Sequence, residues 1–131
     1  MNLTDFAKET HENARLHGWW DEECSFGEII ALCHSELSEA LEAFRSGMPV
    51  DKVVYRFDGC GDMTKDECAG CYNGNPKCFH AKPDGVPAEL ADCIIRILDW
   101  CGEAGIDIED VIRRKHEYNK TRPYRHGGKK L

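Results

Sequence analysis

Two pairs of acidic residues, each with its members three positions apart, point most directly to chemistry in this sequence. The four residues are Glu36, Glu39, Glu89 and Asp92. Residues three apart share one face of an α-helix, so two adjacent helices would bring four carboxylates together. Like charges at one place resist ionisation unless a cation balances them, and carboxylate oxygens are ligands that Mg²⁺ or Mn²⁺ prefers. The alternative, solvated acids on amphipathic helices, is weaker for Glu89 and Asp92 because their segment has few other polar positions.

The segments that carry these residues are predicted to be helices. Hydrophobic residues recur at helical spacing in the second segment, and the third is apolar on nearly all sides, which favours a central helix. Thr4 and Asp107 are the expected N-caps of the first and last helices. The predicted helices span residues 4–17, 26–45, 88–101 and 107–119. We therefore predict an all-α fold, a bundle of about four helices that forms a single domain over residues 1–131.

The segment between the second and third predicted helices, residues 51–84, differs in composition from the rest. It is rich in Gly, Cys, Asp and Lys, and it holds half of the eight cysteines: Cys60, Cys68, Cys71 and Cys78. Four thiolates are a ligand set of structural zinc, and the two-residue gap between Cys68 and Cys71 is typical of such sites. We predict an irregular, Cys-rich insertion that binds Zn²⁺. The open alternatives are reduced thiols, a redox pair, an iron–sulfur cluster, or His80 in place of one cysteine.

The overall composition is that of an ordinary globular domain. The chain has 131 residues, of which 41% are hydrophobic and 31% charged, so it can bury a core. No apolar run is long enough to cross a bilayer, and the first residues lack the pattern of a secretion signal. We expect a cytoplasmic protein without a membrane partner, whose cysteines are reduced or metal-bound. The cysteines outside the insertion are expected to pack as small apolar residues: Cys24, Cys33, Cys93 and Cys101.

The charge is divided unevenly along the chain. Residues 111–131 contain eight Lys or Arg and one acid, a charge of +7, whereas the other 110 residues contain nine bases and 23 acids, a charge of −14. An acidic body with a short basic tail is poorly suited to duplex DNA, so we do not expect nucleic acid as a partner. The pattern suits carboxylates that hold cations and a tail that meets a small anion. A solvated basic tail is the simpler alternative.

The acidic pairs stand in sequence contexts that resemble a known family. Residues 34–42 read HSELSEALE, residues 85–92 read GVPAELAD, and the tail contains KHEYNKTRPY and HGGK. These motifs resemble those of the MazG-like all-α nucleoside triphosphate pyrophosphohydrolases, and the likeness covers nearly all of the chain except about 51–82. The resemblance implies hydrolysis of a nucleoside or deoxynucleoside triphosphate to the monophosphate and pyrophosphate. It implies Mg²⁺ or Mn²⁺ held by the four carboxylates, with one of them as the general base for the attacking water.

Two features depart from the family pattern. The acidic pairs are farther apart in the sequence than is usual, because the Cys-rich insertion lies between them. Ser35 occupies a position where many relatives carry another Glu. The first difference concerns the geometry of the loop, and the second bears on the affinity or number of metal ions.

The resemblance also implies roles for residues outside the acidic pairs. Lys115, Asn119 and Arg122 are spaced by four and three, so a helix that continued to Arg122 would place them in one stripe for contacts with phosphates. The simpler alternative is a basic helix end that faces solvent. Separately from the resemblance, Trp20 lies shortly after Gly18 and is a candidate to stack on a base, as aromatic rings generally do, with core packing as the alternative.

The resemblance further implies self-association, since family members with this helix pattern associate and a short bundle buries little surface alone. We expect a homodimer or a dimer of dimers. The alternative to an enzyme is a catalytically silent, zinc-bearing module that binds nucleic acid or a protein partner. The four carboxylates argue against it, because a binding module has no need to place them on apolar helices.

Overall fold

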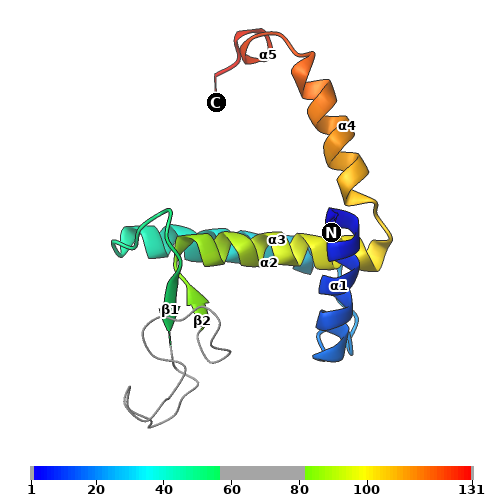
Figure 1. The fold of residues 1–131 in the computed structure, drawn as a ribbon, viewed down its shortest axis with the longest axis vertical. Helices are drawn as coiled ribbons and strands as arrows, with labels where there is room; N and C mark the ends of the chain where they lie inside the picture. Colours follow the sequence, from blue (N-terminus) through cyan, green and yellow to red (C-terminus); the bar gives the residue numbers. More distant parts are fainter. Residues whose placement is uncertain (1, 57–81, 131) are drawn as a thin grey trace. The chain divides into compact units, whose positions relative to one another are not determined.

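The computed structural model describes residues 2–56 and 82–130, and these are mostly helical (Figure 1). The elements in chain order are α1 (Leu3–Leu16), α2 (Phe26–Arg45), β1 (Val54–Arg56), β2 (Lys82–Asp84), α3 (Val86–Ala104), α4 (Ile108–Lys120) and α5 (Arg125–Gly128). The predicted all-α fold with four main helices is confirmed, and residues 57–81 lie between α2 and α3. The short strands β1 and β2 are an addition to that prediction. None of the described helices is long and apolar enough to cross a membrane.

The chain divides into two units, which we describe separately. One comprises Met1–Phe26 and Ile97–Leu131, and the other comprises Gly27–Arg96. The first unit contains α1, α4, α5 and the C-terminal part of α3. The second contains the two strands, nearly all of α2 and the N-terminal part of α3.

In the first unit, α1 begins earlier than predicted, and its N-cap is not Thr4. Asn2 has an extended backbone, and its side-chain oxygen accepts a hydrogen bond from the backbone N–H of Asp5 at 2.8 Å. The Thr4 hydroxyl lies inside the first turn and donates to Oδ1 of Asp107 at 2.6 Å. Asp107 is the N-cap of α4, as predicted, and accepts a hydrogen bond from the backbone N–H of Asp110. Thr4 therefore links the starts of α1 and α4 instead of capping its own helix.

The end of α3 approaches α1 closely at Gly102. A Cβ atom at this position would lie 2.5 Å from Cβ of His11 and 2.6 Å from the carbonyl oxygen of Ala7, so only glycine fits. The buried cluster beside this contact consists of Ala7, Leu98 and Cys101, with Ile108 packed against it. In the core of this unit, α1 and the end of α3 therefore pack with their backbones close together, and the buried side chains there are mostly small.

In the second unit, α2 turns one narrow stripe toward α3. The buried residues of α2 recur every three or four positions: Ile29, Cys33, Glu36 and Ala40. The thiols of Cys33 and Cys93 form a hydrogen bond, and both side chains are buried. The sequence predicts a broader apolar stripe and a central third helix, but several of the large side chains are about half exposed: Leu37, Leu41, Phe44 and Ile94. Two helices cover only one stripe of each other, which leaves these residues outside the contact.

The helix α2 ends at the position that its sequence indicates. Gly47 has a φ of +88°, a conformation that glycine adopts without strain. The N–H of Gly47 donates to the carbonyl of Phe44, and the N–H of Met48 donates to the carbonyl of Ala43, both at 3.0 Å. This is the hydrogen-bond pattern of a Schellman motif, which satisfies the last carbonyls of the helix.

The two strands form a small antiparallel sheet that carries the described ends of the insertion. Val54 pairs with Asp84, Tyr55 with Pro83, and Arg56 with Lys82. The Arg56 guanidinium also forms an ion pair with the carboxylate of Asp84, which is buried, and this contact lowers the pKa of Asp84. The sheet thus places the two residues that flank 57–81 opposite each other. Each strand has only three residues, too few for a recognisable alternation in the sequence.

Candidate metal centre

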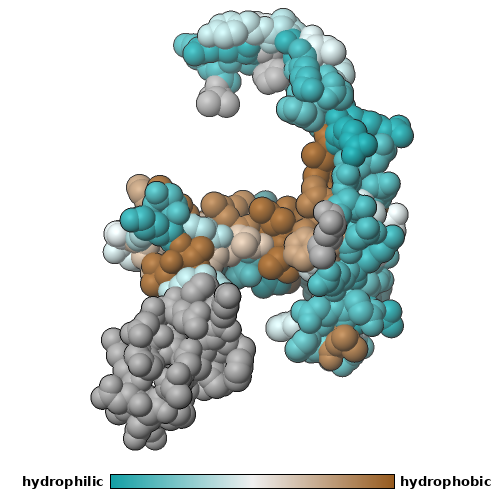
Figure 2. All heavy atoms as spheres, in the orientation of Figure 1, coloured by the Kyte–Doolittle hydropathy of each residue, from teal (hydrophilic) through white to brown (hydrophobic). Residues whose placement is uncertain are grey.

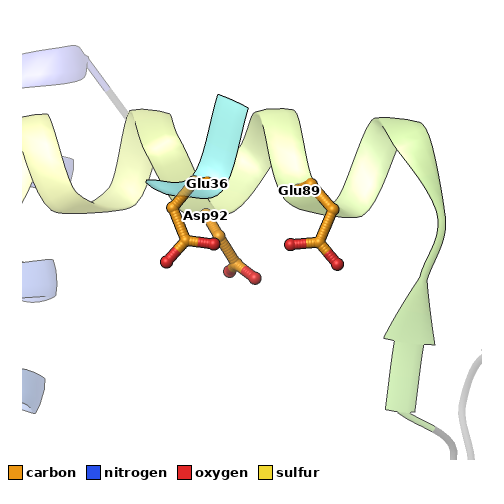
Figure 3. A group of neighbouring side chains, drawn as sticks. All are labelled: Glu36, Glu89 and Asp92. Atoms are coloured by element: carbon orange, nitrogen blue, oxygen red, sulfur yellow. The ribbon is translucent and has the colours of Figure 1, made fainter. Parts of the chain in front are cut away.

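Three of the four predicted carboxylates come together in the second unit (Figure 3). Glu36 comes from α2, and Glu89 and Asp92 come from the first two turns of α3. Each offers one carboxylate oxygen, and these oxygens all lie within 4.8 Å of one another. Figure 3 shows the three carboxyl groups pointing toward the same side of α3. The spacing of three residues on α3 produces this convergence, because it puts Glu89 and Asp92 on one face of the helix.

The surroundings of the cluster disfavour negative charge. The pKa of Glu89 is raised from 4.5 to about 7, first by burial, then by a hydrogen bond with Glu39 and by the negative charges of Glu39, Asp92 and Glu36. The pKa of Asp92 is also raised, by burial and by the charge of Glu36. A bound divalent cation would remove this penalty, because it favours the ionised form of every ligand.

The fourth predicted carboxylate, Glu39, occupies a different position from the other three. Its side chain is exposed, and it is joined to the cluster through its hydrogen bond with Glu89. The structure therefore brings Glu36, Glu89 and Asp92 together, and Glu39 contacts this cluster through Glu89. Glu39 and Asp92 are exposed, Glu89 is half-buried and Glu36 is buried.

An arginine that sequence reasoning did not single out contacts the cluster. The Nε–H of Arg96 donates a hydrogen bond of 2.6 Å to Oε1 of Glu36. The Glu36 side chain is 9% exposed, and that of Arg96 is 35% exposed. The signal was available in the sequence: Arg96 is the one Lys or Arg in the segment 86–104, and it follows Glu89 by seven residues and Asp92 by four. That spacing places a base on the acidic face of the helix.

The predictions for the cysteines have separate outcomes. Cys33, Cys93 and Cys101 are buried, as predicted, and Cys24 is half-buried. Burial raises the pKa of the Cys33 thiol, with a further contribution from Cys93. The proposed zinc ligands lie outside the described residues: Cys60, Cys68, Cys71 and Cys78.

The predicted phosphate-binding residues belong to the first unit. Lys115 and Asn119 are exposed on α4, and the Lys115 ammonium lies 5.4 Å from the centre of the Tyr118 ring. The helix ends at Lys120, so Arg122 does not extend a helical stripe with Lys115 and Asn119. Its backbone N–H instead donates to the carbonyl of Asn119 in the turn after the helix.

Trp20 lies in a polar and aromatic network of the first unit. Its indole N–H donates to both carboxylate oxygens of Asp99, at 2.9 and 3.1 Å. The same carboxylate is 2.8 Å from Nδ1 of His11, whose Nε2 is 2.9 Å from Glu103. The Trp20 ring also contacts the rings of His11 and Trp100. Asp99 was not identified from the sequence, because its role depends on the contact between α3 and the residues after α1.

The donor set of the cluster fits a hard divalent cation. The oxygen ligands of six-coordinate Mg²⁺ lie roughly 3–4 Å from one another. The three carboxylate oxygens of the cluster, all within 4.8 Å of one another, therefore need only small side-chain rotations to bind one ion. Among the described residues, the cluster offers carboxylate oxygens as ligands, which favours Mg²⁺ or Mn²⁺ over softer metals. Comparison of the chain with protein-family models, with curated proteins and with solved structures finds no significant match.

Proposed function

We propose that the protein hydrolyses a nucleoside or deoxynucleoside triphosphate to the monophosphate and pyrophosphate, with Mg²⁺ or Mn²⁺ as cofactor. The observation that carries the proposal is the cluster of Glu36, Glu89 and Asp92, with its oxygens within 4.8 Å of one another. The raised pKa values of Glu89 and Asp92 support it, because such a cluster is relieved by a bound cation. The resemblance of the flanking sequences to MazG-like pyrophosphohydrolases suggests the reaction.

The carboxylates have distinct parts in this proposal. Glu36, buried and held by Arg96, supplies an oxygen from α2, while Glu89 and Asp92 supply oxygens from one face of α3. Glu39 orients Glu89 through their hydrogen bond and is open to water. A bound metal ion would neutralise phosphate charge and lower the pKa of a bound water.

The proposal assigns substrate contacts to residues of the first unit. Lys115 and Asn119 are exposed and one helical turn apart, as suits contacts with phosphate oxygens, and Arg122 follows them. Trp20 is the proposed stacking residue for the base. Its indole N–H is engaged by Asp99, so any contact with a base would use the ring.

The first experiment measures pyrophosphate release from a panel of ribo- and deoxynucleoside triphosphates, with Mg²⁺ and with chelator. We expect Mg²⁺-dependent release that is lost in Glu36→Gln and in Asp92→Asn, by at least about 100-fold if each removes a metal ligand. Glu42→Gln is the matched control, because Glu42 is an exposed acid of α2 whose partner, Arg45, is 3.9 Å away. Full activity in Asp92→Asn would show that the active site lies elsewhere. Absence of release from every substrate would favour the silent binding module.

We further propose that the protein functions as a homodimer or a dimer of dimers. Brown, hydrophobic side chains gather along α2 and α3 in Figure 2. The large apolar residues of the second unit that remain at least 39% exposed include Ile30, Leu32, Leu37, Leu41, Phe44, Leu90, Ile94 and Ile95. Large exposed apolar side chains gathered on one part of a protein commonly mark a site of association. Light scattering coupled to size exclusion tests this: a dimer or tetramer mass is expected, and the monomer mass at micromolar concentration would contradict it.

The structural Zn²⁺ in the Cys-rich insertion is also part of the proposal. Elemental analysis of the purified protein is expected to find about one Zn²⁺ per chain, and the double variant Cys68→Ser/Cys71→Ser should lose it. Bound iron, or no bound metal in protein purified without chelator, would contradict this assignment.

A further inference from the structure

We infer that Arg96 is a positioning residue, which fixes the carboxylate of Glu36 so that its second oxygen is available to a divalent cation. The inference rests on the proposed metal site and adds a residue that neither the acidic motifs nor the family resemblance singled out. Its basis is the hydrogen bond of 2.6 Å from Nε of Arg96 to Oε1 of Glu36. This distance is at the short end for a charge-assisted hydrogen bond, and such bonds hold their partners more firmly than neutral ones do.

The position of Glu36 explains why it needs such a partner. Its side chain is 9% exposed and lies in the buried stripe of α2, beside the acidic groups Glu89 and Asp92. Burying a charged group is costly unless a group of opposite charge and a hydrogen-bond partner accompany it. Arg96 provides both the positive charge and the donor. The ion pair therefore gives the buried Glu36 carboxylate a fixed partner on α3.

The geometry of the pair distinguishes positioning from simple neutralisation. The hydrogen bond uses Oε1 of Glu36, and the cluster needs only one oxygen from each carboxylate. Arg96 can therefore remain bonded to Oε1 while Oε2 binds a cation. Donors that orient ligating carboxylates in this way are common around metal sites, and their loss typically weakens metal binding by about 10–100-fold.

The spacing of residues along α3 independently supports a positioning role for Arg96. Glu89, Asp92 and Arg96 follow one another at spacings of three and four on α3, so they share one face. This face carries two of the proposed ligands and the residue that orients the third ligand, which comes from α2. Arg96 thus ties the position of the α2 ligand to that of the α3 ligands.

The test is the affinity for Mn²⁺, measured by the electron paramagnetic resonance signal of the free ion in a titration of the full chain. For Arg96→Met, which keeps the length of the side chain but removes its charge and donors, we expect binding about 10–100-fold weaker than that of the wild type. For Arg96→Lys, which keeps the charge and can still donate but lacks the planar guanidinium, we expect a smaller loss. Arg45→Met is the matched control, because Arg45 is an exposed arginine of the same unit and its ion pair with Glu42 is long, at 3.9 Å.

If Arg96 opposed metal binding, its replacement would change the affinity for Mn²⁺ in the opposite direction. If Arg96 only repels the incoming cation, Arg96→Met binds Mn²⁺ as tightly as the wild type or more tightly, and the inference is overturned. Dependence on Glu36 is tested with Glu36→Gln, in which Arg96→Met should weaken binding by less than about twofold further. An undiminished effect of Arg96→Met in that variant would show that Arg96 does not act through Glu36.

The failure of this inference is distinguishable from the failure of the proposed function. A wild-type protein that binds no Mn²⁺ contradicts the metal site, and the inference fails with it. A wild type that binds Mn²⁺, with Arg96 variants of equal affinity, contradicts the inference alone. Circular dichroism monitors the fold of each variant. If Arg96→Met does not fold, Arg96→Lys decides, and an affinity equal to that of the wild type overturns the inference.

Discussion

The carboxyl groups of Glu39 and Glu89 form a hydrogen bond with each other. A hydrogen bond between two carboxyl groups needs a proton on one of them, so this contact favours the protonated form of Glu89 and raises its pKa. Burial is the largest cause of the raised pKa of Glu89, and the bond with Glu39 and the charges of Asp92 and Glu36 act in the same direction. Without a bound cation, the cluster therefore retains a proton close to neutral pH.

The retained proton makes the stability of the metal-free protein depend on pH. Folding raises the pKa of Glu89 from 4.5 to about 7, so the folded chain binds this proton more tightly than the unfolded chain does. The resulting stabilisation is complete below pH 4.5 and is lost as the pH rises through about 7. Asp92, whose pKa is also raised, contributes with the same sign. We expect the free energy of unfolding to fall by about 1–2 kcal/mol across this window, less than the full pKa shift would give because Glu89 is partly exposed.

Urea unfolding at a series of pH values in the presence of chelator measures this dependence. In Glu89→Gln, which cannot ionise, the fall in stability should be clearly smaller. Glu42→Gln, a change at an exposed acid of α2, should leave the dependence as in the wild type. Identical pH profiles for the wild type and Glu89→Gln would show that Glu89 has an ordinary pKa.

The convergence of Glu36, Glu89 and Asp92 could be predicted from the sequence because it depends on helix geometry and on the packing of α2 beside α3. The spacing of three within each pair puts Glu89 and Asp92 on one face, and only the adjacency of α2 and α3 had to be assumed. The bond from Arg96 to Glu36 could not be predicted, because it depends on how far α2 is shifted along α3. The strands β1 and β2 were missed for another reason: they are three residues long and are defined by their pairing rather than by their own pattern.

Added metal should reverse the loss of stability at high pH. Metal ligation requires ionised carboxylates, so Mg²⁺ or Mn²⁺ should stabilise the protein more at pH 8 than at pH 5.5. At a concentration 100 times the dissociation constant, the stabilisation is about 2.7 kcal/mol. Thermal unfolding with and without Mn²⁺ at both pH values measures it. Asp92→Asn should lose most of the effect, and an equal shift in that variant would mean that the ion binds elsewhere.

The neighbouring tryptophans Trp19 and Trp20 should respond differently to the same substitution. Trp20→Phe removes the N–H that donates to Asp99 and leaves that half-buried carboxylate with fewer partners, so we expect a loss of about 1–3 kcal/mol in the free energy of unfolding. Trp19 is 75% exposed, and Trp19→Phe should change stability by less than about 0.5 kcal/mol. Urea unfolding followed by circular dichroism compares the two variants. Equal effects would contradict a structural role for the bond between Trp20 and Asp99.

Gly102→Ala tests the close approach of α1 and α3, and here two effects of opposite sign compete. In an exposed helix, replacing glycine with alanine stabilises by about 0.5–1 kcal/mol, because alanine loses less conformational entropy on folding. At Gly102 the new Cβ would lie 2.5 Å from Cβ of His11 and 2.6 Å from the carbonyl oxygen of Ala7. Neither atom is at the free end of a flexible side chain, so α1 itself must shift, and overpacking of this kind typically costs about 1–3 kcal/mol. The clash is therefore expected to outweigh the gain in helix propensity.

Thermal or urea unfolding of Gly102→Ala should show a net loss of about 1–2 kcal/mol. The displacement of α1 should also weaken the contacts of His11 with Asp99 and Glu103, which lie on the same stretch of α3. The NMR signals of the His11 ring should therefore move in this variant. Ala104→Ser, a change at an exposed position two residues further along α3, is the control and should leave both stability and the His11 signals nearly unchanged. A gain in stability for Gly102→Ala would show that α1 and α3 are farther apart than the structure places them.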